Sequence, residues 1–138
     1  MGTRRSVLIV DDDAAVRAGL TSVLESKEVD VKTAASLQEA EGFLRDTRFD
    51  LVMTDLRMNG PFCFEGWEVI WRVKDRFPDT RVVLFTAFGT PEIEQVAKRL
   101  GAADCWSKST PIEEIVSHIR AFGIPVGRAK PGSEGGTP

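Results

Sequence analysis

The chain has 138 residues, of which 42% are hydrophobic and 28% are charged, so we expect one folded domain rather than a disordered chain. Its 18 basic and 21 acidic side chains give a net charge of −3 at pH 7, which argues against a nucleic-acid surface. No apolar run approaches the ~20 residues that span a bilayer, and two cysteines with one histidine are too few for a disulfide scaffold or a zinc site, so we expect a cytoplasmic protein.

Short β-rich runs alternate with helical patterns along the first 122 residues. The apolar run Val7–Val10, for example, is typical of a strand buried on both faces of a sheet. In chain order we expect a strand over 7–10, a helix over 14–26, a strand over 29–34, a helix opening at 36, a strand over 50–54, a helix over 66–77, a strand over 81–86, a helix from 90 to 101, a strand over 104–107 and a helix from 110 to 122.

Helix starts carry capping signals. Ser36 opens a capping box, and Thr90 is followed by a proline in the first helical turn. Thr110 opens a second capping box and predicts Pro111 at the first helical position, while Gly101 ends the helix before it. Five strands alternating with five helices predict an α/β fold with a parallel sheet and helices on both of its faces.

The composition changes after residue 122. Residues 123–138 hold five of the 12 glycines and three of the 7 prolines. We therefore expect a domain over 1–122 and a flexible tail, or the start of a linker, over 123–138.

Polar side chains follow four of the five expected strands at their carboxyl ends, where ligands bind in open parallel sheets. Carboxylates gathered there repel one another unless a cation intervenes, and hard oxygens suit magnesium, Mg²⁺. An aspartate beside such a cation can itself accept a phosphoryl group. The residues are Asp11, Asp12 and Asp13 after the first strand, Asp55 after the third, Thr86 at the end of the fourth and Lys108 after the fifth.

Each of these residues alone has an ordinary structural interpretation. Asp13 is expected to cap the first helix, Thr86 alone is a turn residue, and Lys108 alone is a solvated surface lysine. The combination, in this order and spacing, favours the phosphoryl site.

Val10–Asp13, Asp55, Thr86, Ala87 and Lys108 resemble the receiver domain of two-component response regulators, and the resemblance covers residues 6 to about 122. It implies a flavodoxin-like, doubly wound sheet in the strand order 2-1-3-4-5. It also implies a signalling switch that catalyses only its own aspartyl phosphorylation and dephosphorylation. The implied donor is a phosphohistidine on a sensor histidine kinase or histidine phosphotransfer protein, and the implied output is altered binding to a downstream effector.

The resemblance further implies a role for each matching residue. Asp55 would be the phosphoacceptor, Mg²⁺ would be held by Asp12 directly and by Asp11 mainly through water, and Ala87 would leave access to Asp55. The full implied set is Asp11, Asp12, Asp55 and the backbone carbonyl of Arg57 for the metal, and Thr86 and Lys108 for the phosphoryl group.

The sequence departs from the family pattern at four places. Ser109 replaces the proline that usually follows the lysine, so we expect the Lys108–Ser109 bond to be trans. Cys105 occupies the aromatic switch position on the last strand, Asn59 replaces a proline, and the segment 55–66 is longer than usual.

These departures bear on how the signal leaves the domain. Cys105 is too small to fill the space that an aromatic switch residue would fill, and the neighbouring Trp106 should point to the opposite face. We expect the signal to pass instead through residues 56–66, which carry Phe62 and Phe64.

Two other functions stay open from the sequence alone. One is a receiver-fold binding module without phosphotransfer, and the other is a Mg²⁺-dependent phosphatase with an aspartyl-phosphate intermediate. His118 is expected to be structural or exposed, and Trp67 and Trp71 are expected to be packing residues.

Overall fold

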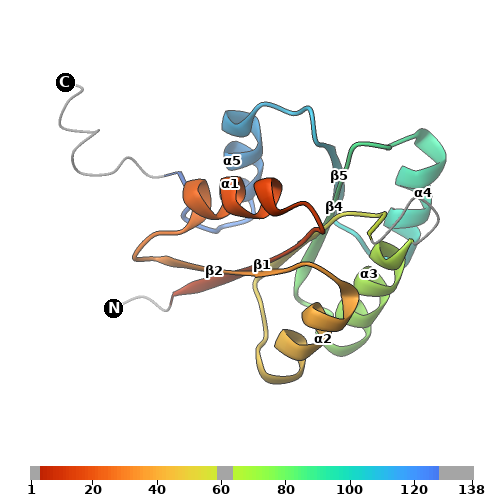
Figure 1. Ribbon diagram of the computed structural model, residues 1–138, viewed down its shortest axis with the longest axis horizontal. Helices are drawn as coiled ribbons and strands as arrows, with labels where there is room; N and C mark the ends of the chain where they lie inside the picture. The colour runs from red at the N-terminus through yellow and green to blue at the C-terminus, as the bar shows by residue number, and fades with distance from the viewer. Residues whose placement is uncertain (1–3, 59–63, 128–138) are drawn as a thin grey trace.

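The computed structural model describes residues 4–58 and 64–127, in which five strands alternate with five helices (Figure 1). The strands are β1 (Arg5–Val10), β2 (Val29–Ala34), β3 (Leu51–Thr54), β4 (Arg81–Thr86) and β5 (Asp104–Ser107). The helices are α1 (Ala14–Leu24), α2 (Leu37–Asp46), α3 (Glu65–Arg76), α4 (Pro91–Leu100) and α5 (Ile112–Ala121). Within the described ranges, no helix is long and apolar enough to cross a membrane.

The strands form one parallel sheet in the order β2-β1-β3-β4-β5, which confirms the predicted fold. The register aligns the strand ends: Val10, the last residue of β1, lies opposite Thr54, the last residue of β3. Thr86 at the end of β4 lies opposite Ser107 at the end of β5. The residues that follow these four strands therefore emerge side by side at one edge of the sheet.

Each face of the sheet supports its own apolar core, because side chains alternate along every strand. In β1, Val7 and Ile9 join the cluster that includes α1 and α5, whereas Leu8 and Val10 join the cluster that includes α2, α3 and α4. This two-faced burial explains why the strands are almost continuously apolar in sequence. It also fixes their carboxyl ends in place.

Side-chain caps begin three of the helices. Asp13 accepts a hydrogen bond from the Ala15 backbone (2.9 Å), so its predicted capping role is confirmed. Ser36 and Thr90 cap α2 and α4 in the same way. The predicted capping box at Thr110 is wrong. The backbone amide of Thr110 donates to the Ser107 carbonyl in a turn, and α5 begins only after Pro111, without a side-chain cap.

Two apolar residues that follow residue 122 also pack on the core. Ile124 and Val126 are 3% and 0% exposed and belong to the α1–α5 core, and Arg120 donates to the Val126 carbonyl (3.2 Å). Two apolar residues in a Gly/Pro-rich stretch are thus enough to dock it on the core. The rest of the expected tail, 128–138, lies outside the described residues.

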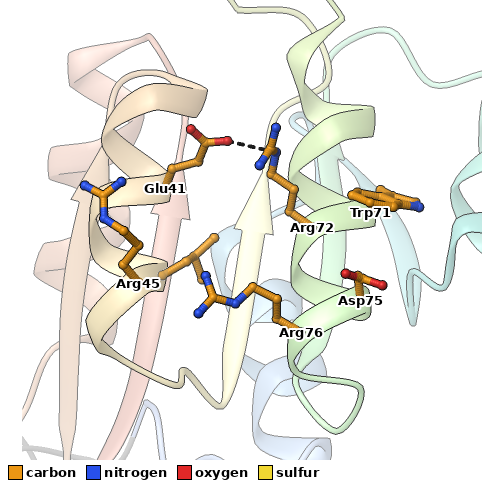
Figure 2. A pocket seen from close by; sticks show the side chains of 7 residues that line it. Glu41, Arg45, Trp71, Arg72, Asp75 and Arg76 are labelled. Carbon is orange, nitrogen blue, oxygen red and sulfur yellow. Dashed lines mark ion pairs between the residues drawn. The ribbon is translucent and has the colours of Figure 1, made fainter.

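The two tryptophans of α3 have different environments. Trp67 packs against the α2–α4 core, as predicted, but Trp71 is 51% exposed, so its prediction as a packing residue is wrong. Ile70 already occupies the buried position, and the next residue along a helix turns about 100° away from it. On the other side of α3, Arg72 forms an ion pair with Glu41 of α2 at 2.8 Å (Figure 2).

Candidate functional site

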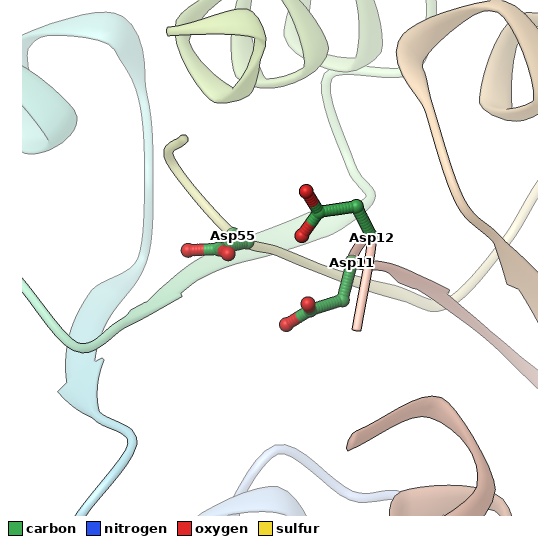
Figure 3. A group of neighbouring side chains, drawn as sticks. All are labelled: Asp11, Asp12 and Asp55. Atoms are coloured by element: carbon green, nitrogen blue, oxygen red, sulfur yellow. The ribbon is translucent and has the colours of Figure 1, made fainter. Parts of the chain in front are cut away.

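Three carboxylates meet at the carboxyl edge of the sheet (Figure 3). Oxygens of Asp11, Asp12 and Asp55 all lie within 4.8 Å of one another. Asp11 and Asp55 are buried, with 1% and 7% of their surface exposed, whereas Asp12 is open to solvent. The strand register therefore brings together the acidic residues that the sequence predicted.

Backbone amides hold the two buried carboxylates in position. Asp55 accepts a hydrogen bond from its neighbour Leu56 (2.8 Å), and Asp11 accepts one from Asp13 (2.9 Å). The guanidinium of Arg17 donates to the backbone carbonyl of Asp11 (2.8 Å), which ties α1 to the end of β1. These contacts leave one oxygen of each buried carboxylate directed at the site.

Lys108 brings the opposite charge from the end of β5. Its Nζ lies 2.7 Å from Asp11 Oδ2 and donates to Asp55 Oδ2 at 2.9 Å. Burial alone would lower the pKa of Lys108, but its contacts with Asp11 and Asp55 outweigh burial and raise it. The lysine is therefore a fixed cation between two buried carboxylates.

Burial raises the pKa of Asp11 above its usual value, although Lys108 and the Asp13 amide counteract part of that shift. Lys108 and the Asp13 amide thus offset only part of the cost of burying the charged Asp11 carboxylate. Consistent with this, Asp11 Oδ2 is among the buried side-chain atoms of the described residues that make no hydrogen bond of good geometry, so its contact with Lys108 is an ion pair rather than an aligned hydrogen bond.

This donor set fits a divalent cation. Mg²⁺ prefers carboxylate and carbonyl oxygens together with water, and it would neutralise the repulsion within the cluster. Asp11 Oδ2 is buried and lacks an aligned partner, Asp12 is open to water, and Asp55 is within reach of both. The residues present therefore suit the ion that the sequence implies.

Thr86 is the last residue of β4, and Ala87 follows it at the carboxyl edge of the sheet. Thr86 is fully buried, and its Oγ1 accepts a hydrogen bond from the Phe88 backbone (3.2 Å). Its carbonyl accepts from the Lys108 amide (3.1 Å), so the two residues predicted to contact a phosphoryl group are linked through the backbone. Ala87 is exposed beside them.

Phe88 is a site neighbour that the sequence analysis missed. The guanidinium of Arg57 lies over its ring, 3.4 Å from the centroid, and Phe64 lies 6.0 Å from the same guanidinium. The cation–π contact joins the β3–α3 connection to the β4–α4 connection. No sequence pattern links positions 57 and 88, whereas Asn59 and Phe62, which the sequence singled out, lie outside the described residues.

The departures on β5 have clear structural outcomes. The described residues contain no cis peptide bond, so Lys108–Ser109 is trans as predicted. Ser109 closes the turn itself, since its amide donates to the Ser107 hydroxyl (3.1 Å). Cys105 packs toward the α2–α4 core and Trp106 toward the α1–α5 core, which confirms their opposite directions.

A family model described as the response regulator receiver domain matches residues 7–120. The chain belongs to this family. Receiver domains are signalling switches rather than classical enzymes, they typically bind Mg²⁺ at an acidic pocket, and they interact with kinases and effectors. In this chain Asp11, Asp12 and Asp55 form an acidic cluster whose oxygens could hold a metal ion.

Known relatives and structures agree with this assignment. Sporulation initiation phosphotransferase F of Bacillus subtilis is 30% identical over 84% of this chain and 91% of its own length. The photosynthetic apparatus regulatory protein RegA of Rhodobacter capsulatus is 27% identical. The match covers 89% of this chain but only 65% of the length of RegA. Among solved structures, the chemotaxis protein CheY4 of Vibrio cholerae is similar with a TM-score of 0.78 and 26% identity, covering 87% of this chain and 99% of that one. The non-phosphorylated HemR receiver domain from Leptospira biflexa also has a TM-score of 0.78 and 26% identity, over 92% and 99% of the two chains.

Proposed function

We propose that this receiver domain accepts a phosphoryl group on Asp55 from a phosphohistidine of a sensor histidine kinase or histidine phosphotransfer protein in the cytoplasm. The observation that carries the proposal is the position of Asp55. Its carboxylate is buried at the sheet edge and accepts a hydrogen bond from Lys108 Nζ at 2.9 Å. Oxygens of Asp11, Asp12 and Asp55 lie within 4.8 Å of one another.

Each carboxylate has a distinct part in the proposed site. Asp12, which is open to solvent, would hold Mg²⁺ directly, while Asp11 would act mainly through water, and Asp55 and the backbone carbonyl of Arg57 would complete the protein ligands. When bound, Mg²⁺ would neutralise negative charge on the phosphoryl oxygens. Asp11 also holds Lys108 in place through their ion pair.

In the transfer itself, the reacting and stabilising side chains all come from the sheet edge. A carboxylate oxygen of Asp55 attacks phosphorus, a P–O bond forms, the P–N bond of the phosphohistidine breaks, and the imidazole leaves with the electron pair. Lys108 would pair with the phosphoryl oxygens in place of the Asp55 carboxylate, and Thr86 would donate its hydroxyl to them. The small side chain of Ala87 leaves room for the donor.

The consequence would be altered binding to a downstream effector protein or domain. The match covers 65% of the length of RegA and 23% of the length of the response regulator protein PilR of Pseudomonas aeruginosa, so both relatives are longer than the matched region. A further domain of the same protein and a separate effector protein both fit the proposal. Cys105 leaves the usual aromatic switch position small, and its thiol is partly buried against the α2–α4 core. We therefore place the conformational response on the loops next to Asp55 rather than on β5.

Intact mass spectrometry with a small-molecule acyl phosphate tests this proposal. In the presence of Mg²⁺ the protein should gain one phosphoryl group, and Asp55→Asn should abolish the gain. Asp13→Asn is the matched control, because asparagine caps a helix as well as aspartate does and should leave labelling intact. Labelling of the Asp55→Asn variant at the wild-type rate would refute the assignment.

A further inference from the structure

A hollow between α2 and α3, which we call the α2–α3 hollow, is lined mostly by charged side chains. It has a volume of about 280 Å³, and its lining residues are Glu41, Leu44, Arg45, Trp71, Arg72, Asp75 and Arg76. An ion pair between Glu41 and Arg72 joins the two helices at this place (Figure 2). What the hollow can bind therefore depends on which of its charged groups are already paired.

The acidic residue best placed to pair with Arg45 is engaged by the neighbouring helix. Glu41 precedes Arg45 by four residues on α2, the spacing at which acidic and basic side chains pair along a helix. Glu41 instead lies 2.8 Å from Arg72, which also pairs with Glu68 at 3.0 Å. The Arg45 guanidinium is exposed, and within residues 4–58 and 64–127 it makes neither an ion pair nor a hydrogen bond. No neighbour therefore neutralises its charge.

Arg76 is a second such cation, on the α3 wall of the hollow. The residue four positions before it on α3 is Arg72, which has the same charge. The Arg76 guanidinium lies 5.5 Å from the ring of its neighbour Phe77, a contact that neutralises no charge, and it forms no ion pair with a described residue. Asp75 also lines the hollow, but Figure 2 shows its carboxylate beside Trp71, on the side of α3 that faces away from α2. That carboxylate therefore does not lie between the two arginines.

These features fit acidic side chains of a protein segment. Arginine pairs with carboxylates through its planar fork of N–H donors, and arginine clusters recognise acidic motifs. The volume of the hollow is below the roughly 300–1,000 Å³ of small-molecule sites, which favours one or two side chains over a whole free ligand. Leu44, which is 4% exposed, adds an apolar contact for the methylene groups of a glutamate or for an apolar neighbour.

We propose that the α2–α3 hollow docks an acidic segment of a partner protein, with a carboxylate between Arg45 and Arg76. The chain as a whole has a net charge of −3, which disfavours non-specific contact with an acidic segment. The two unpaired arginines would therefore decide where such a segment binds.

The arginine end of the hollow lies at the opposite end of the domain from the acidic cluster. Arg45 and Arg76 are in the last turns of α2 and α3, whereas the acidic cluster lies at the edge where the strands end and the helices begin. Docking therefore does not rest on the proposed phosphotransfer, and a docked segment leaves Asp55 accessible to a phosphodonor. The hollow would hold a partner whether or not the domain is phosphorylated.

Fluorescence anisotropy with an acidic peptide tests this inference. The probe is a fluorescein-labelled peptide of Glu-Glu-Leu repeats, about 12 residues long, in a buffer with about 50 mM salt. Saturable 1:1 binding to the unphosphorylated protein is expected. Arg45→Glu and Arg76→Glu should each weaken binding about tenfold or more, because each places a like charge where the carboxylate docks.

Arg99→Glu is the matched control. Arg99 is also an exposed arginine in the last turn of a helix, α4, it does not line the hollow, and its replacement changes the net charge equally. This variant should bind the peptide as the wild type does. All three variants should keep the wild-type rate of labelling by an acyl phosphate, which separates a failure of docking from a failure of the proposed phosphotransfer.

The proposal is overturned if the acidic peptide does not bind, if Arg45→Glu and Arg99→Glu weaken binding equally, or if a peptide of Gln-Gln-Leu repeats binds as tightly. Displacement of the peptide by millimolar inorganic phosphate, but not by chloride of equal ionic strength, would show a phosphate site. A dimer in sedimentation that Arg45→Glu dissociates would show that a second copy occupies the hollow. Either of these two results also overturns the proposal.

Discussion

Gly66 is predicted to be indispensable because it packs directly on the backbone of Asp55. Gly66 is buried at the start of α3, and its amide donates to the Leu56 carbonyl at 3.0 Å. A methyl group placed on Gly66 would lie 2.6 Å from the Cα of Leu56 and closer still to the carbonyl oxygen of Asp55, whereas ordinary contacts begin at 3.4 Å. Both obstructing atoms belong to the backbone, so no side-chain rotation relieves the clash.

Gly66→Ala should therefore lower the free energy of unfolding by about 1–3 kcal/mol, as is typical of overpacking a filled core. The clash also displaces Asp55 from the sheet edge, and a displacement approaching 1 Å slows a positioned reaction by up to about 100-fold. Urea unfolding followed by tryptophan fluorescence measures the first effect, and the rate of labelling by an acyl phosphate measures the second.

Gly19→Ala is the matched control, because nothing lies within 4 Å of the added methyl group on α1. Removing a glycine from an exposed helix should raise stability by about 0.5–1 kcal/mol without changing the labelling rate. If Gly66→Ala unfolds at the wild-type urea concentration and is labelled at the wild-type rate, the close packing of α3 on Asp55 is refuted.

Three further predictions follow from the site and the core. In calorimetric titrations, Asp12→Ala should weaken Mg²⁺ binding about tenfold or more, whereas Asp13→Ala should leave it unchanged and cost about 1 kcal/mol of stability as a lost cap; equal losses of affinity would contradict the division of roles. Because burial raises the pKa of Asp11 above 3.8, protonated Asp11 favours the fold at low pH and this stabilisation is lost as pH rises through the folded-state pKa. Metal-free Asp11→Asn should therefore gain stability relative to the wild type as pH rises toward 7, and a gain only at acid pH would contradict that sign. Thr80→Val should lower the unfolding free energy by about 1–3 kcal/mol, because the buried Thr80 hydroxyl donates to the Phe49 carbonyl at 2.6 Å; an unchanged urea midpoint would argue against that hydrogen bond.

The fold and the acidic cluster were accessible from the sequence because their signals are local. Continuous apolar runs such as Val7–Val10 predict strands buried on both faces, and parallel pairing then brings Asp11 and Asp55 to one edge without further information. The predicted Asp13 cap follows in the same way, from a single residue type at a helix start.

Other features were missed because they depend on tertiary packing. Trp71 fits an apolar helix stripe, yet its neighbour Ile70 occupies the buried position and leaves the indole exposed. Ile124 and Val126 lie in a Gly/Pro-rich stretch that suggests a tail, but the core has room for both. The contact between Arg57 and Phe88 joins two loops that no local pattern connects.

The most direct test of the central claim is to locate the phosphoryl group on the chain. Borohydride reduces an aspartyl phosphate to homoserine, which tandem mass spectrometry assigns to one position. After labelling with an acyl phosphate and Mg²⁺, we predict homoserine at position 55 and unmodified aspartate at positions 11 and 12. Homoserine at Asp11 or Asp12, with Asp55 unchanged, would contradict the account.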